Sequence, residues 1–518
     1  MVASSIHPEG CSSGRFGHVA ELAIVGAGYG GTQTLAELVR QTTGPLRIHL
    51  IESRRALSLG VAYSTTDGSH LLNVRAAKMG AFADDIGGFY DWLLTDAGQA
   101  AVARYCPTLE VTPDGFLPRA VYGVYLQARH QATLTAALGK GIVVVTHHAT
   151  AVDAQWLGAD QQRLVVTLRS EHGPSELAVD ALVLATGNLP PRQLDGVAAL
   201  GDSSSRFVAD LWNPPPESPF PQQVASLPQQ SDVVIIGTGL TMVDAVLSLV
   251  SHGYRGRVTA ISRHGLLPQD HAEDRCYPDG SMACCPSEAP QSARGLLSGL
   301  RKEVERAAAR GFPWQSVVDA LRTQTQVLWQ RLPLTEQRRF FQRLAPFWSV
   351  HRHRVAPRAS QTVQGLIAQG RLRVVAGHLQ QVAERPDGLL VRYRMRGSRE
   401  GATCSAALVL NCTGPDYRIE RGPNPLLLSL LRRGLVVPCP LGMGLAQTPD
   451  GAVQGEASSC LFTLGFLRTG ALLESTAVPE LRQQAAQVAQ SVLARLARLS
   501  RSEAGRVERW PRLSSSLP

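Results

Sequence analysis

The chain has 518 residues, of which 44% are hydrophobic and 18% are charged, and this length exceeds what one core supports, so we expect two or three domains of an ordinary α/β protein. The formal net charge of +9 is spread along the chain without a dense Lys/Arg run, which argues against a nucleic-acid partner. No apolar run approaches the 18 residues of a membrane span, so we also expect no membrane partner.

The N-terminal residues 1–20 contain no apolar core typical of a signal peptide, so we interpret them as a disordered lead-in of a cytoplasmic protein. The nine cysteines are scattered, and none forms a C-x-x-C pair. This pattern favours reduced thiols and predicts no metal site.

A glycine-rich turn between a strand and a helix opens the first predicted domain. The apolar run Leu22–Val25 precedes a G-x-G-x-x-G motif, and the next strand ends in an acid, Glu52. Gly26 allows the tight turn, Gly28 lets the backbone approach a pyrophosphate, and Gly31 lets the helix pack on the strand. Glu52 would accept hydrogen bonds from a ribose. The order of strand, glycine turn, helix, strand and acid therefore predicts a dinucleotide site.

A second buried strand closes the same domain. The stretch "AVDALVLATGNLPP" ends in a turn that contains Thr186 and Gly187, followed by a double proline typical of a linker. In flavoproteins with two dinucleotide sites, such a turn closes the FAD domain. We therefore predict the first part of an FAD-binding domain at 21–225.

The stretch "VVIIGTGLTMVD" at 233–244 repeats the strand, turn and helix design. Gly237 and Gly239 stand where Gly26 and Gly28 stand in the first unit, whereas Met242 replaces the third glycine. The pattern predicts a second dinucleotide site with looser packing of the helix on the strand.

The strand after this second unit ends in Ser262 and Arg263, where the first unit has Glu52. A carboxylate there repels a 2′-phosphate, whereas a hydroxyl and a guanidinium bind one. The site is therefore predicted to favour NADPH over NADH as hydride donor. The structural alternative is that Arg263 only faces solvent.

The remaining chain predicts an NAD(P)H-binding domain at 226–415 with a helical insertion at about 291–343. A second strand-then-turn closure lies in "AALVLNCTGPD", after which 416–490 is expected to return to the FAD domain, and 491–518 to form a flexible tail. The predicted fold class is thus α/β, with two Rossmann-like domains of the two-dinucleotide flavoprotein type. Because Cys106 stands alone between Leu22 and Pro191, dithiol chemistry is disfavoured, and a monooxygenase needs no such pair.

Several long strings resemble a known family. They include "GVAYSTTDGSHLLNVRAAKMGAFADD", "FLPRAVYGVYL", "AISRHGLLPQDH", "FWSVHRHRVAP" and "LGFLRTGALLESTAVPELR". The chain is similar to the FAD/NAD(P)-binding proteins of the bacterial YdhS-like group, and through "LATGNLPP" to flavin-dependent monooxygenases. The resemblance implies bound FAD, and NADPH or NADH as hydride donor.

The resemblance also implies roles for single residues. Tyr63, with His70, Asn73 and Met79, would cover the flavin, although Tyr63 and Met79 suit a plain core equally well. Asn73 and Arg119 would stabilise the anionic reduced flavin, Arg119 having a surface ion pair as its alternative. Gly465 and Thr476 would begin a helix whose N-terminus points at the flavin.

His351 and Arg352 lie in a segment rich in aromatic, His and Arg residues, and we expect them to position an anionic substrate or the nicotinamide phosphates. Two histidines at i, i+2, His351 and His353, do not share a helix face, so no metal is expected.

The leading hypothesis is a monooxygenase that consumes NAD(P)H and O2. The resemblance implies urate as first substrate, converted to 5-hydroxyisourate through a flavin C4a-hydroperoxide. Two alternatives remain: an N-hydroxylase acting on an amino acid or amine, and an NAD(P)H:acceptor flavin oxidoreductase that inserts no oxygen. The sequence leaves the oligomeric state open.

Overall fold

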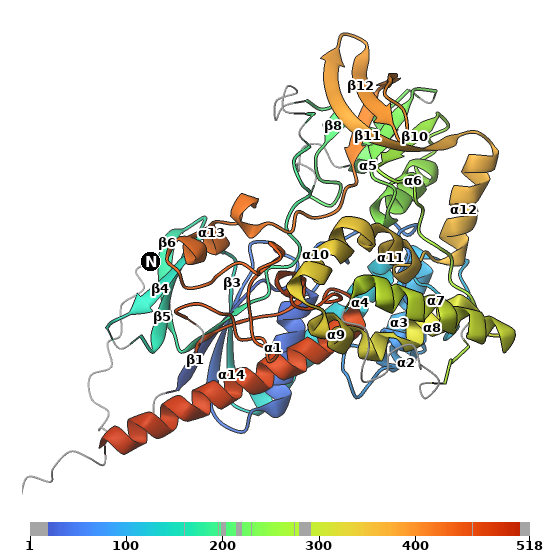
Figure 1. Cartoon of the computed structure of the whole chain (residues 1–518). Coiled ribbons are helices and arrows are strands. Elements are labelled where there is room, and N and C mark those ends of the chain that lie inside the picture. The colour runs from blue at the N-terminus through green and yellow to red at the C-terminus, as the bar shows by residue number, and fades with distance from the viewer. Residues whose placement is uncertain are drawn as a thin grey trace, which may run out of the picture.

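The computed structural model describes residues 19–159, 161–194, 196–197, 204–213, 220–228, 230–273, 275–278, 292–457 and 459–507. Most of the expected lead-in and the last eleven residues therefore lie outside the described part of the chain. The described chain folds around two mainly parallel sheets and a smaller antiparallel sheet, with a group of helices beside them (Figure 1).

The first sheet has five parallel strands in the order β15-β7-β1-β2-β3. The strands are β1 (Ala20–Val25), β2 (Leu46–Ile51), β3 (Val143–His147), β7 (Ala181–Leu184) and β15 (Leu461–Thr463). The central strands are apolar runs because both faces of the sheet are covered, one by helices and the other by a separate antiparallel sheet. The covering helices are α1 (Tyr29–Gln41), α4 (Arg119–Gly139) and α14 (Val478–Val507).

A separate antiparallel sheet contains β4 (Thr150–Leu157), β5 (Arg163–Ser170) and β6 (Gly173–Val179). Its apolar face shares a core with α13 (Pro425–Arg432), η4 (Ile419–Arg421) and strand β7. The residues after 416 thus pack on the first domain, and β15 adds a strand to its sheet.

The second sheet has the order β13-β12-β11-β10-β9-β14-β8, with parallel pairing from β11 to β8 and an antiparallel edge. The strands are β8 (Phe207–Val208), β9 (Val233–Ile236), β10 (Val258–Ser262), β11 (Leu372–Arg385), β12 (Gly388–Met395), β13 (Gly401–Ala406) and β14 (Leu408–Asn411). The helices α5 (Phe220–Ser226), α6 (Leu240–Ser251) and α12 (Pro357–Ala368) share its core. Because β8 and α5 belong here, the chain enters the second domain before residue 207, earlier than the boundary at 225 drawn from the sequence.

An aromatic cluster fills the space beside α4 in the first domain. Tyr122 is fully buried and contacts Tyr63 and Phe89 edge-on, with ring centroids 4.9 Å apart in each pair. Met79 is also buried in this core. The flanking helices are η1 (Ala76–Lys78), α2 (Gly88–Leu93) and α3 (Asp96–Tyr105).

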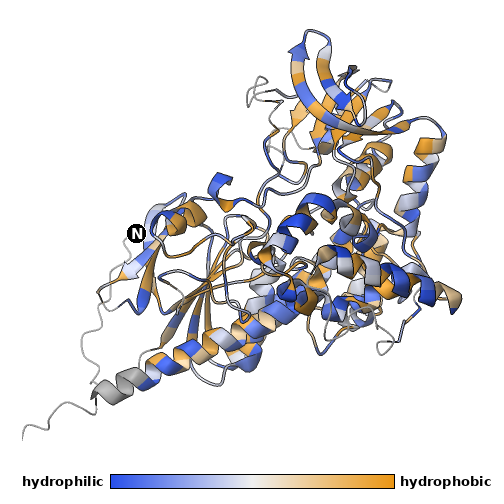
Figure 2. Ribbon diagram, in the orientation of Figure 1, coloured by the Kyte–Doolittle hydropathy of each residue, from blue (hydrophilic) through white to orange (hydrophobic). Residues whose placement is uncertain are grey.

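The helical insertion consists of α7 (Ala293–Ala309), α8 (Trp314–Ala320), α9 (Arg322–Arg331), α10 (Leu334–Arg343) and α11 (Ala345–Arg352). It lies beside the N-terminal end of α14, the long red helix in Figure 1. The short helix η5 (Gly465–Arg468) precedes α14, which continues to Val507, well past the boundary at 490 where a flexible tail was expected. Hydrophobic colouring concentrates in the strands and the inner helix faces (Figure 2). None of the described helices is long and apolar enough to cross a membrane.

Candidate functional site

The first glycine turn is held by close backbone packing. Gly26 has a φ of +98°, and a Cβ there would lie 2.3 Å from the carbonyl oxygen of Ala185. A Cβ on Gly31 would lie 1.8 Å from the carbonyl oxygen of Gly26. Only glycine therefore allows β1, β7 and α1 to meet as closely as they do.

Among the described residues, no side chain caps the N-terminus of α1 at this turn. Gly28 caps the helix without a side-chain hydrogen bond, and the first turn carries no acidic residue. Glu52, at the end of β2, accepts hydrogen bonds from the amides of Ala27 at 2.9 Å and Arg54 at 3.1 Å. An uncapped helix N-terminus beside a fixed carboxylate suits a phosphate next to a ribose.

Two buried hydroxyl groups near the same turn have no hydrogen-bond partner among the described residues: Ser58 Oγ and Thr186 Oγ1. Both residues lie beside the turn. The amide of Ser58 donates a hydrogen bond to the Ala27 carbonyl at 2.7 Å, and a Cβ added to Gly26 would lie 3.2 Å from the Cα of Thr186. Gly187 follows with a φ of +72°. Since buried polar groups are normally paired, these hydroxyls fit a bound FAD.

The second glycine turn repeats this construction at α6. Gly237 has a φ of +111°, and a Cβ there would lie 2.3 Å from the carbonyl oxygen of Cys412 on the closing strand. Gly239 caps α6 without a side-chain hydrogen bond, and nothing lies within 4 Å of its ideal Cβ. Met242 is fully buried in the core of this domain. The open space at Gly239 is where a pyrophosphate would approach.

The end of β10 carries the residues predicted to select NADPH. Ser262 Oγ lies 2.8 Å from Thr238 Oγ1 and accepts a hydrogen bond from the Gly265 amide at 3.0 Å, whereas Arg263 is exposed. Burial lowers the pKa of His264, and the positive charges of Arg396 and then Arg263 lower it further. This edge of the domain is therefore electropositive.

Arg396 was not found from the sequence, because it lies more than a hundred residues after Arg263. The β11–β12 hairpin returns it to β10: its amide donates to the Ala376 carbonyl at 2.9 Å, and Ala376 is the register partner of Ser262. No local pattern marks such a position, which depends on strand pairing.

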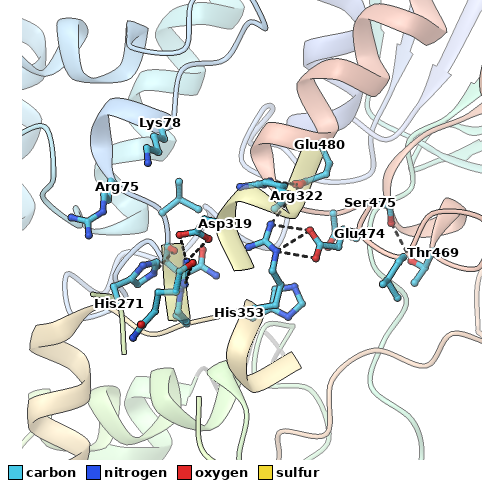
Figure 3. Close-up of a pocket in the computed structure, with 18 of the residues that line it drawn as sticks. Arg75, Lys78, His271, Asp319, Arg322, His353, Thr469, Glu474, Ser475 and Glu480 are labelled. Carbon is cyan, nitrogen blue, oxygen red and sulfur yellow. Dashed lines mark hydrogen bonds and ion pairs between the residues drawn. The ribbon is translucent and has the colours of Figure 1, made fainter. Parts of the chain in front are cut away.

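A charged cavity of about 420 Å³ lies between the first domain, the helical insertion and the start of α14 (Figure 3). Of the predicted site residues, Asn73, Arg352 and Thr476 line it. The residues that sequence reasoning missed include His271, Asp319, Arg322, Glu474 and Glu480.

Two ion pairs join the insertion to the start of α14. Arg352 donates from Nε to both oxygens of Glu474, at 2.8 and 3.0 Å, and Arg322 binds Glu480 through two bonds of 2.6 Å. Burial alone would lower the pKa of Arg352, but the Glu474 carboxylate outweighs it and raises that pKa. The network, visible in Figure 3, fixes the wall of the cavity near Thr476.

Two histidines with lowered pKa values line the cavity. Desolvation by the surrounding groups lowers the pKa of His353 to about 4, helped by the charge of Arg352, although part of the residue is exposed to solvent. Burial also lowers the pKa of His271 to about 4, and its Nε2 lies 3.1 Å from the Asn73 carbonyl oxygen. Neutral imidazoles offer hydrogen bonds without adding charge.

The other predicted residues lie away from this cavity. Arg119 forms an ion pair with Asp244 at 2.8 Å, and Tyr63 belongs to the aromatic cluster. His351 turns to the opposite side of α11 and packs against Trp314, with ring centroids 5.0 Å apart. Gly465, with a φ of +74°, donates its amide to Gln484 Oε1 at 2.8 Å, which ties η5 to α14.

Residues 23–189 match a protein family described as FAD-NAD(P)-binding, so this part of the chain is an FAD/NAD(P)-binding domain. No curated protein matches the chain in sequence. In the part of the chain that the structure describes, no group of three or more His, Cys, Asp or Glu residues is placed to hold a metal ion.

Three solved structures show the same overall fold, and each covers 92% of this chain and has 100% of its own chain covered. They are the ornithine hydroxylase from Pseudomonas aeruginosa, with a TM-score of 0.60 and 15% identity, the ornithine N-hydroxylase from Kutzneria sp. 744 with reduced FAD, NADP+ and L-ornithine, with 0.59 and 15%, and the L-lysine 6-monooxygenase from Pseudomonas syringae, with 0.61 and 14%. At these identities the likeness establishes the two-dinucleotide fold.

Proposed function

We propose that the protein is an FAD-dependent monooxygenase that uses NADPH and O2 to hydroxylate the amino group of a small substrate. When bound, FAD supplies the transfer of electrons from NADPH to O2. One oxygen atom enters an N–H bond to give N–OH, and the other leaves as water with the two electrons from NADPH. The first glycine turn would hold FAD, and the second would hold NADPH.

The observation that carries the choice of substrate is the mixed charge of the cavity. Carboxylates, guanidinium groups and neutral imidazoles line one space beside the N-terminus of α14. Such a lining suits an amine or a zwitterionic amino acid, whose ammonium and carboxylate groups need partners of both signs. The amine substrates in the names of the structural relatives support the same choice.

Urate, the first substrate expected from the sequence, gains no support from the cavity or from the comparisons. In the described lining, Arg352, Arg322 and Arg354 are each paired with a carboxylate, and Arg75 and Lys78 also line the cavity. The amine substrates named for the structural relatives therefore favour the N-hydroxylase hypothesis over the urate hypothesis.

Dithiol chemistry, which the sequence already disfavours, gains no support from Cys106. Burial raises the pKa of the Cys106 thiol to about 11, so this residue is not a reactive thiolate at neutral pH. Electron transfer to a quinone without oxygen insertion remains the alternative, and the experiment must distinguish it from hydroxylation.

The experiment follows NADPH oxidation by the purified flavoprotein with ornithine, lysine, cadaverine, urate and a quinone in turn. We expect amine-dependent oxidation together with a hydroxylamine product. Oxidation that depends on a quinone, or that yields only peroxide with every amine, would contradict the proposal.

His353→Gln tests whether the cavity is the substrate site. We expect a raised KM for the amine with unchanged flavin content, because the imidazole lines the cavity and not the glycine turn. His172→Gln, at an exposed turn of the small antiparallel sheet, is the matched control and should behave as the unchanged protein.

A further inference from the structure

We propose that the substrate carries an alkyl chain, and that a second, apolar cavity in the helical insertion binds this chain while the amino group lies in the charged cavity. The inference rests on the proposed function and specifies the class of amine. The apolar cavity has a volume of about 590 Å³, within the range of small-molecule sites. Its lining includes Leu297, Leu300, Trp314, Trp329, Phe340 and Trp348.

A shared wall separates the two cavities. Along α8 and the start of α9, Gln315, Asp319 and Arg322 line the charged cavity. Trp314, Val318 and Leu321 alternate with them and line the apolar cavity. Each set follows the three-to-four-residue spacing of one helix face, so this wall is polar on one side and apolar on the other.

The same division occurs on α11 and the segment after it, where His351 faces the apolar cavity and Arg352 faces the charged one.

Leu473 lines both cavities, so the two spaces lie against the same side chain. The next residue, Glu474, holds Arg352 on the charged side. A ligand that passes Leu473 therefore has its polar end among the ion pairs and its chain among leucines and aromatic rings.

One polar atom in the apolar lining has no partner. Trp348 Nε1 is buried and unpaired among the described residues, whereas Trp329 Nε1 donates to the Gly470 carbonyl at 3.1 Å. An alkyl chain offers no acceptor to this N–H, so the proposal rests on the apolar lining and not on the indole. Burial of each methylene of an alkyl chain against this lining contributes to affinity through the hydrophobic effect.

The test compares octylamine with butylamine as ligands and substrates of the FAD-loaded protein. Isothermal titration gives the Kd, and NADPH oxidation gives the KM. We expect octylamine to bind at least about tenfold more tightly than butylamine and to have the lower KM. Equal values for the two amines would overturn the inference.

Leu300→Trp fills the apolar cavity without touching either glycine turn. We expect it to abolish the preference for octylamine over butylamine while the flavin content and the KM for NADPH remain unchanged. Leu157→Trp, at an exposed position of β4, is the control and should keep the preference. If Leu300→Trp loses its flavin, Leu297→Trp, which also lines the cavity, replaces it.

The outcomes separate the two proposals. Hydroxylation of butylamine and octylamine with equal KM overturns the alkyl-chain inference and supports the proposed function. Tight octylamine binding that Leu300→Trp abolishes, with no oxidation of any amine, supports the apolar site and overturns the proposed function.

Discussion

Arg119 Nη2 donates a 2.8 Å hydrogen bond to Asp244 Oδ2, and this ion pair joins α4 of the first domain to α6 of the second. Beside it, His70 Nε2 lies 2.8 Å from Ser248 Oγ, again across the two domains. Burial raises the pKa of the Asp244 carboxyl, and the positive charge of Arg119 opposes this effect. The two dinucleotide domains are thus connected by buried polar contacts as well as by the chain.

Arg119→Met should destabilise the fold, because it leaves a buried carboxylate without its partner. Loss of one member of a buried ion pair costs about 3–5 kcal/mol of unfolding free energy, which urea unfolding would measure. The double variant Arg119→Met, Asp244→Leu should recover much of this loss.

Arg392→Met, at an exposed position, is the control for this ion pair. If Arg119 instead contacts the flavin, as the sequence resemblance implies, Arg119→Met would shift the reduction potential of the flavin with little loss of stability.

Gly239→Val should weaken NADPH binding while the fold and the bound flavin are retained. The residue has a φ of −83°, which valine tolerates, and nothing lies within 4 Å of its Cβ, so the added side chain enters open space. We expect the KM for NADPH to rise at least about tenfold, since the side chain occupies the path of the pyrophosphate. Gly365→Val, on α12 of the same domain and equally open, should leave this KM unchanged.

Arg263→Ala and Arg396→Ala should each raise the KM for NADPH far more than the KM for NADH. Both charges lie near His264 at the end of β10, where a 2′-phosphate would be bound. Steady-state kinetics with each nucleotide measures the ratio, and Arg399→Ala, at an exposed position, is the control. An equal effect on both nucleotides would exclude the 2′-phosphate role.

The stability of the protein should decrease as the pH falls from about 6.5 towards 4. His271 and His353 have pKa values of about 4 in the folded protein, below the ordinary value of 6.5, so the unfolded chain binds more protons in this window. Their contribution to stability is complete above pH 6.5 and is lost on acidification.

The variants His271→Asn and His353→Asn should each flatten the dependence of Tm on pH in this window. Thermal unfolding at a series of pH values measures the slope. His172→Asn, at an exposed position, should keep the slope of the unchanged protein, and unchanged slopes in both cavity variants would show that these imidazoles titrate normally.

The sequence predicted the fold because the fold depends on local patterns. Each glycine turn follows an apolar strand and precedes a helix, and the short-range spacing alone specifies that unit.

The cavity was predicted only in part. Arg352 was identified within a conspicuous segment, but its partner Glu474 lies more than a hundred residues later, and only packing brings the two together.

The position of β15 in the first sheet also has a consequence for how the protein is made. The strand Leu461–Thr463 pairs with β7, and residues of α14 such as Val488 and Val492 complete the core around β1. During synthesis, the first domain thus emerges without its edge strand β15, which is translated only after the entire second domain. Its final folding step is therefore the docking of the last segment of the chain, so the first domain is completed after the second.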